Sequence, residues 1–167
     1  MLATMHAFID WLANTEMSSV IQNVTWIIPT VQTVHIICVG IVISAVFLVD
    51  MRILGVFART QPLASLSHRF LPWIWYAVIV LLITGSILII GEPTRSVLNP
   101  AFLAKMAMLL VVASLTRVIQ RPLIRDAGYW DASAGRRATL KGIAVASLAL
   151  WSCIVFAGRW IAYIASY

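Results

Sequence analysis

The chain has 167 residues, of which 62% are hydrophobic and 11% are charged. A soluble domain is typically about 45–50% apolar and about 25% charged. The polar residues are therefore too few to cover a water-soluble globule, which excludes a soluble single-domain protein and a disordered chain. The net charge is +6. Its positive residues cluster in loops between apolar runs, which indicates contact with lipid headgroups rather than with nucleic acid.

Residues 1–25 differ in pattern from the rest of the chain. Met5, Phe8, Ile9 and Leu12 recur at helical spacing, and polar side chains lie between them. This pattern predicts an amphipathic helix that lies on the outer membrane surface.

Residues 26–167 contain four apolar runs, and each can cross a bilayer as a helix of about 20 residues. We predict the spans at about 29–54, 71–90, 101–118 and 142–163. Asn99-Pro100 marks a helix start, while Gly91-Glu92-Pro93 and Gln120-Arg121-Pro122 mark helix ends. The predicted fold is all-α, a four-helix transmembrane bundle with an N-terminal amphipathic interfacial helix.

Basic residues are distributed unevenly between the two sides of this bundle. One side has nine: Arg52, Arg59, Arg69, Arg117, Arg121, Arg125, Arg136, Arg137 and Lys141. The other side has three: Arg95, Lys105 and Arg159. Because cytoplasmic loops carry the excess of Lys and Arg, we expect both termini outside the cytoplasm.

Three polar side chains of the first span fall on one predicted helix face. Gln32 and Asp50 are five turns apart, and His35 lies roughly 60° from them around the helix. We expect this polar membrane face of Gln32, His35 and Asp50 to look into the bundle. Asp50 would either pair with a nearby arginine or handle a proton or cation.

His35 and Lys105 lie at similar predicted depths in the membrane. His35 is about 9 Å below Pro29, and Lys105 and Met106 are about 7–9 Å below Pro100. Thr84 reaches a similar level on the second span. A cofactor-binding site could be built from five residues: His35, Thr84, Lys105, Met106 and Met108. Alternatively, His35 is hydrogen-bonded to a neighbouring Thr or Ser and Lys105 extends to the headgroups.

Some residues of the spans could bind copper or haem iron. His35 and Cys38 form a His-x-x-Cys pair, whose soft ligands suit Cu(I). Haem iron takes His or Met ligands, but His68 lies on the order of 25 Å from His35 along the membrane normal. A haem would therefore use His35 with Met106, with Met108, with His6 or with no second protein ligand.

Several segments together resemble a known family: His35-Ile-Ile-Cys-Val-Gly40, Asp50-Met-Arg52-Ile-Leu-Gly55, Leu71-Pro-Trp73, Thr84-Gly85 and Asn99-Pro-Ala-Phe-Leu-Ala-Lys105. They are similar to small uncharacterised bacterial four-helix integral membrane proteins, over roughly residues 25–125. The resemblance implies a bacterial membrane protein. In the inner membrane of a bacterium, the distribution of basic residues would place both termini on the periplasmic side. More distantly, His35 and Lys105 are similar to positions in the copper-resistance D family and in the membrane protoporphyrinogen oxidase, which implies redox, porphyrin or copper chemistry.

Three hypotheses for the function follow. The first is a redox component that binds haem b or a quinone near the outer leaflet, through His35 and Lys105. The second is a non-catalytic accessory subunit of a membrane complex. The third is ion or small-solute transport, or copper handling, by a homo-oligomer whose Gln32, His35 and Asp50 line a path.

Overall fold

The computed structural model describes residues 2–57, 60–93 and 99–164. In chain order, the helices are α1 (Leu2–Ala13), α2 (Glu16–Asn23), α3 (Ile27–Leu54), α4 (Leu63–Gly91), α6 (Pro100–Arg125), the short 3-10 helix η1 (Tyr129–Asp131) and α7 (Ala134–Ile164). Helices α3, α4, α6 and α7 are long and apolar enough to cross a membrane. The predicted all-α fold, with four spanning helices behind an N-terminal helical segment, is confirmed.

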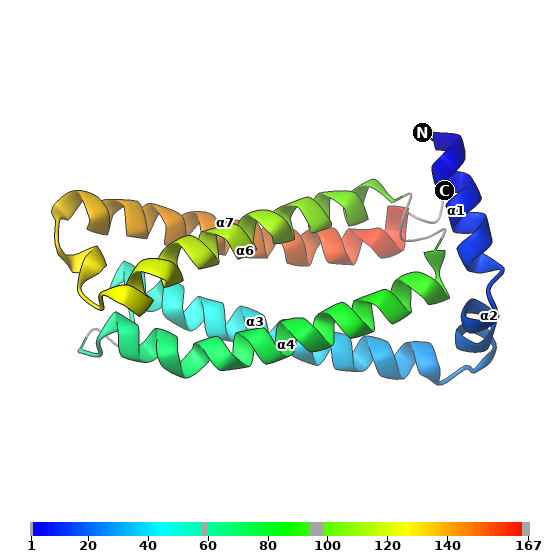
Figure 1. The fold of residues 1–167 in the computed structure, drawn as a ribbon, viewed down its shortest axis with the longest axis horizontal. Helices are drawn as coiled ribbons and strands as arrows, with labels where there is room; N and C mark the ends of the chain where they lie inside the picture. Colours follow the sequence, from blue (N-terminus) through cyan, green and yellow to red (C-terminus); the bar gives the residue numbers. More distant parts are fainter. Residues whose placement is uncertain (1, 58–59, 94–98, 165–167) are drawn as a thin grey trace.

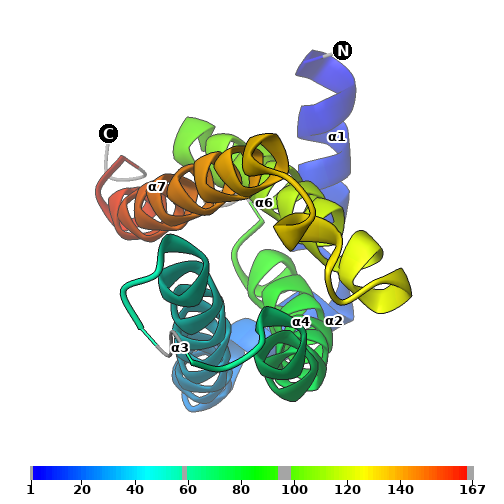
Figure 2. The same cartoon turned by 90° about the vertical axis from the view of Figure 1, so that its left-hand side faces the viewer.

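The four spanning helices form two antiparallel pairs. Helix α3 packs along α4, helix α6 packs along α7, and the pairs meet mainly where α3 contacts α7 (Figures 1 and 2). We call the end with the α3–α4 and α6–α7 connections the basic end. The opposite end has α1, α2 and the end of α7, and there α3 and α7 diverge (Figure 1).

The apolar surface of the spanning helices faces mostly outward. In the most apolar stretch of each helix, only 11–28% of the residues are buried inside the structure. A water-soluble protein would not expose so much contiguous apolar surface, whereas lipid tails cover it without cost. The chain is therefore a multi-pass membrane protein that lies in a lipid bilayer.

Two clusters of buried side chains hold the helices together. The first lies between α3 and α4, and it is built from Cys38, Val42, Ala45, Val46, Ile74 and Ala77. The second lies near the basic end and joins α3, α6, η1 and α7 through Ile53, Ile119, Leu123, Trp130, Leu140 and Ala144. Alanines at such contacts let helix backbones approach closely, as lipid-embedded helices require.

The N-terminal segment is two helices rather than the single surface helix that we predicted over residues 1–25. The first helix ends at Ala13, and Thr15 caps the second by accepting a hydrogen bond from the Ser18 backbone N–H. Side-chain capping at Thr15 favours a new helix start. Helix α1 runs across the axis of the bundle (Figure 1).

The spanning helices extend beyond their apolar runs, mainly toward the basic end. Gln120-Arg121-Pro122 was predicted to end the third span, but α6 continues to Arg125 with Pro122 inside it. Near this end, Trp130 Nε1 donates to the Ile119 carbonyl at 3.1 Å, and the Asp126 N–H donates to the Pro122 carbonyl at 2.9 Å. Pro122 lacks one N–H, so it removes a single helical bond, and the helix ends within one turn after it.

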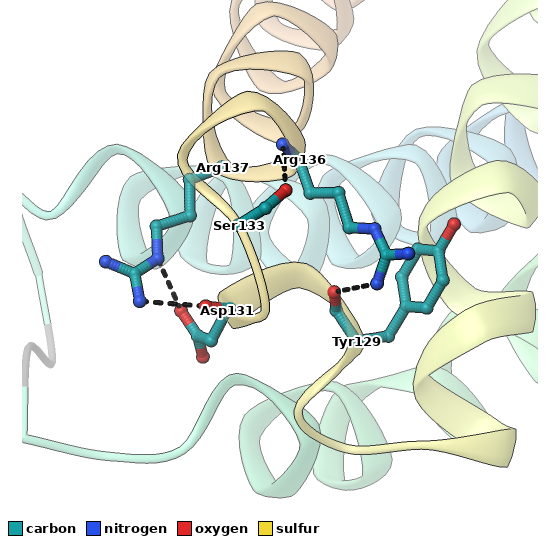
Figure 3. A network of polar contacts seen from close by, with 5 residues as sticks. All are labelled: Tyr129, Asp131, Ser133, Arg136 and Arg137. Atoms are coloured by element: carbon teal, nitrogen blue, oxygen red, sulfur yellow. Dashed lines mark hydrogen bonds and ion pairs between the residues drawn. The ribbon is translucent and has the colours of Figure 1, made fainter.

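The connection between α6 and α7 is a compact turn whose arginines bind back onto it (Figure 3). Arg137 donates to the Asp131 carbonyl at 2.9 Å and forms an ion pair with the Asp131 carboxylate at 3.4 Å. Arg136 donates to the Tyr129 carbonyl at 3.3 Å and stacks on the Tyr129 ring. These contacts fix the basic end around Trp130.

Helix α2 docks on the end of α4 through a close contact at Gly91. Ser18 Oγ, which is fully buried, donates to the Ile90 carbonyl at 2.8 Å. Gln22 Nε2 donates to the Gly91 carbonyl at 2.9 Å. A Cβ atom at Gly91 would lie 2.8 Å from Ile21 Cγ2, which is closer than real contacts allow.

Gly91→Ala should therefore push α2 away from α4. We expect a lower melting temperature, equivalent to about 1–3 kcal/mol, and faster proteolysis between α1 and α3. Gly142→Ala is the matched control, because no atom lies within 4 Å of a Cβ there. Circular dichroism in detergent and limited proteolysis measure both effects. Equal stability and equal proteolysis of the two variants would contradict the docking of α2.

Candidate functional site

His35 lies on α3 and faces α4. Its ring is half-buried, and its Nδ1 lies 2.7 Å from Oγ1 of Thr84, which is 6% exposed. This is a short, well-formed hydrogen bond. It joins the first and second spanning helices toward the end of the bundle that has α1 and α2.

The bonds of Thr84 determine which nitrogen of His35 has a proton. Thr84 Oγ1 also lies 2.8 Å from the Val80 carbonyl, to which its hydroxyl proton must be donated because a carbonyl can only accept. The same oxygen must then accept from His35, so Nδ1 has the proton. In the neutral ring, Nε2 is left with a lone pair that can accept a proton or bind a ligand.

Lys105 on α6 lies near His35. Its side chain is half-buried, and its charge acts on the His35 ring. Among the described residues, no carboxylate forms an ion pair with Lys105. The ammonium is half-buried in a spanning helix, where a charge without a counter-charge is costly. An electron-rich oxygen between Lys105 and His35 would relieve this cost.

Two glycines lie beside these polar side chains. A Cβ at Gly85 of α4 would be 3.5 Å from His35 Cε1, and a Cβ at Gly158 of α7 would be 3.8 Å from Lys105 Nζ. The imidazole therefore lies against the backbone of α4 and the ammonium against the backbone of α7. We call His35, Thr84 and Lys105, with these two glycines, the His35 site. All four spanning helices contribute to it.

Other residues predicted from the sequence lie elsewhere or at its margin. Met106 is 41% exposed on the outer surface of α6, where lipid would contact it. Met108 is half-buried, three residues beyond Lys105 on the same helix face. Cys38 is 8% exposed and packs in the apolar cluster between α3 and α4. The structure thus brings together His35, Thr84 and Lys105, but not Met106 or Cys38.

Gln32 does not share the inward face that the helical periodicity predicted. It is exposed, whereas His35 is half-buried and Asp50 is 2% exposed. Gln32 lies in the second turn of α3, where α3 and α7 diverge (Figure 1). Helical periodicity gives Gln32 the same angle around α3 as Asp50, but its side chain is exposed at that end.

Among the described residues, no arginine forms an ion pair with Asp50, which was one of the two alternatives from the sequence. Residues two apart do not face each other on a helix, so Arg52 points elsewhere. Arg52 Nε donates to the Gln61 carbonyl at 2.7 Å. The side chain of Ser147 from α7 lies beside Asp50 and lines the same cavity. This serine was missed, because a hydroxyl in an apolar span gives no signal of its partner.

The described residues do not gather three His, Cys, Asp or Glu side chains at a possible metal site. The His35–Cys38 pair is therefore not extended by further ligands of these types within the described ranges. Gly85 and Gly158 were also missed as parts of a site. Their signal was weak, because glycine is common in transmembrane helices.

Thr84→Val keeps the shape of the side chain but removes its hydroxyl. We expect a loss of about 1 kcal/mol of stability and a mixture of His35 tautomers, because Nδ1–H no longer has its acceptor. Nitrogen NMR of labelled histidine measures the tautomer. Thr84→Ser should keep the protonated Nδ1, and Thr33→Val, at an exposed threonine of α3, should leave it unchanged. An unaltered tautomer in Thr84→Val would contradict this assignment.

Comparison with known proteins gives a family but no activity. No curated protein and no solved structure matches the chain. The comparisons thus give no support to a distant similarity to the copper-resistance D family or to the membrane protoporphyrinogen oxidase. Residues 8–164, most of the chain, match the family of unknown function DUF6644. The resemblance to an uncharacterised family is confirmed, and the chain belongs to DUF6644.

Proposed function

We propose that this membrane protein binds the headgroup of a quinone or quinol at the His35 site. One observation carries the proposal: a hydrogen-bonded imidazole with its Nε2 lone pair available lies near an ammonium that has no carboxylate partner among the described residues. Both groups are half-buried in spanning helices. A ligand that enters from the bilayer can reach such a site.

The two groups complement the two redox forms of a quinone. The Lys105 ammonium has only donors, so it can bind a quinone carbonyl oxygen. The neutral His35 ring accepts at Nε2, so it can receive a hydrogen bond from a quinol hydroxyl. Thr84 keeps the ring in this tautomer through Nδ1. A bound quinone would supply two-electron, two-proton redox chemistry, and His35 would hold a proton at Nε2.

Haem b fits these residues less well than a quinone. His35 Nε2 could bind iron, and Lys105 could pair with a propionate. However, Met106 is 41% exposed on the outer surface of α6, so it is poorly oriented to be a second axial ligand. A half-buried imidazole with one hydrogen bond suits a small headgroup better than a macrocycle that needs room on both faces.

The charge distribution supports an orientation for this site. Eight of the ten basic residues that the structure describes lie toward the basic end, which the positive-inside rule assigns to the cytoplasm. In a bacterial inner membrane, both termini and helices α1 and α2 would then lie on the periplasmic side. The His35 site would lie in the outer leaflet, where a quinone headgroup can reside.

A titration with a short-chain quinone, followed by quenching of tryptophan fluorescence in detergent, tests the proposal. We expect saturable binding to the wild type. Lys105→Met and His35→Phe should each weaken it about tenfold, since one hydrogen bond involving a charged or ionisable group is worth roughly 1.4 kcal/mol or more. Met106→Leu, one residue from Lys105 but on the exposed surface, is the matched control.

Two outcomes would contradict the proposal. One is the same quinone affinity in wild type, Lys105→Met and His35→Phe. The other is a haem absorption spectrum in the purified wild type that disappears in His35→Phe, which would assign the site to haem b instead.

A further inference from the structure

A second polar site lies inside the bundle, near the basic end and apart from the His35 site. It is a cavity of about 30 Å³ between α3, α4, α6 and α7. Its polar lining consists of Asp50, Ser67, Thr116, Gln120 and Ser147, and the rest of its lining is apolar. We call it the Asp50 cavity. Since a water needs at least about 10–15 Å³ of such space, the cavity holds one or two water-sized groups and no organic ligand.

The carboxylate in this cavity has no positive partner among the described residues. Asp50 is 2% exposed, Ser147 lies beside it, and its Oδ2 has no hydrogen-bond partner in the part of the chain that the structure describes. Within the described ranges, no basic residue lines the cavity. Two arginines close in sequence to lining residues are engaged elsewhere: Arg52 binds the Gln61 carbonyl, and Arg117 stacks over the Trp75 ring. A buried charge without compensation is costly.

The hydroxyl groups around Asp50 present mainly lone pairs to the cavity. Ser147 lies beside Asp50, and its hydroxyl can donate to the carboxylate. Thr116 donates its proton to the Val112 carbonyl at 2.9 Å. Ser67 is 7% exposed, and its Oγ has no partner among the described residues. The cavity is therefore rich in oxygen acceptors that come from all four spanning helices.

We propose that the Asp50 cavity binds one sodium ion. The Asp50 carboxylate would neutralise the ion, and the hydroxyl oxygens of Ser67, Thr116 and Ser147 would complete an all-oxygen shell with Gln120 or a water. Hard cations prefer such oxygen ligands. One carboxylate balances a single positive charge, so a monovalent ion fits better than a divalent one. The ion would also link the two helix pairs, since its ligands lie on both.

The first experiment compares the melting temperature in sodium chloride and in N-methyl-D-glucamine chloride at equal ionic strength. N-methyl-D-glucamine is far too large for the cavity, so it is the control cation. We expect sodium to raise the melting temperature by on the order of 3–6 °C at ten times its dissociation constant. Equilibrium dialysis with radioactive sodium should give about one bound ion per chain.

Variants assign this response to the cavity. Asp50→Asn should abolish the sodium-dependent shift, and Ser67→Ala should raise the half-saturating sodium concentration severalfold. Asp10→Asn removes an exposed carboxylate from α1 and should leave the response unchanged. Lys105→Met should also keep it, so failure at the His35 site and failure at this cavity remain distinguishable.

The proposal is wrong if the wild type melts at the same temperature in both salts and binds no radioactive sodium, in which case a proton neutralises Asp50. It is also wrong if Asp50→Asn keeps the full sodium shift. If Asp50→Asn does not fold, Ser67→Ala decides instead, and an unchanged half-saturating concentration in that variant would refute the site.

Discussion

Lipid tails offer no hydrogen bonds, so every polar group inside a spanning helix must find its partner within the protein. Most polar side chains here satisfy this constraint locally. Exposed hydroxyls such as those of Ser86, Ser114 and Ser152 donate to the carbonyl four residues earlier on their own helix. Such local bonds need no neighbouring helix, and they use the hydroxyl proton, so it is not available to a ligand. Sites arise only where a polar group cannot be satisfied in this way.

The His35 site and the Asp50 cavity meet that description, and α3 contributes to both. Near the end with α1 and α2, His35 uses one ring nitrogen for Thr84 and has the other available beside Lys105. Near the basic end, Asp50 lies beside Ser147 in a cavity, and its Oδ2 has no partner among the described residues. The apolar cluster of α3 and α4 separates them. In the proposals above, the first site binds a lipid-soluble ligand and the second binds an ion that joins the helix pairs.

Composition and periodicity were enough to predict the fold, because a long apolar run can cross lipid only as a helix. The exact residues at which helices begin and end were harder to predict. Thr15 starts a second N-terminal helix through its side-chain cap, and Pro122 lies within α6 rather than ending it. In both cases contacts of single side chains decide the outcome, and a hydropathy pattern does not contain them.

The sites were predictable only in part, for a related reason. Helical rise gave His35, Thr84 and Lys105 a common depth, and the structure brings these three together. Whether a side chain is buried depends on which neighbouring helix packs against it. Gln32 has the helical phase of Asp50, yet one is exposed and the other is buried. Ser67 and Ser147 gave no sequence signal, because their meeting with Asp50 depends on how the helix pairs pack.

The most direct measurement of the central claim is the identity of the lipid-soluble ligand that stays with the protein. Wild type and the Lys105→Met/His35→Phe double variant would be purified in mild detergent, extracted with organic solvent and analysed by mass spectrometry. If the His35 site binds a quinone headgroup, the wild type retains close to one quinone per chain and the double variant retains almost none. Equal amounts in both, or no quinone in a folded wild type purified from quinone-containing membranes, would contradict the claim.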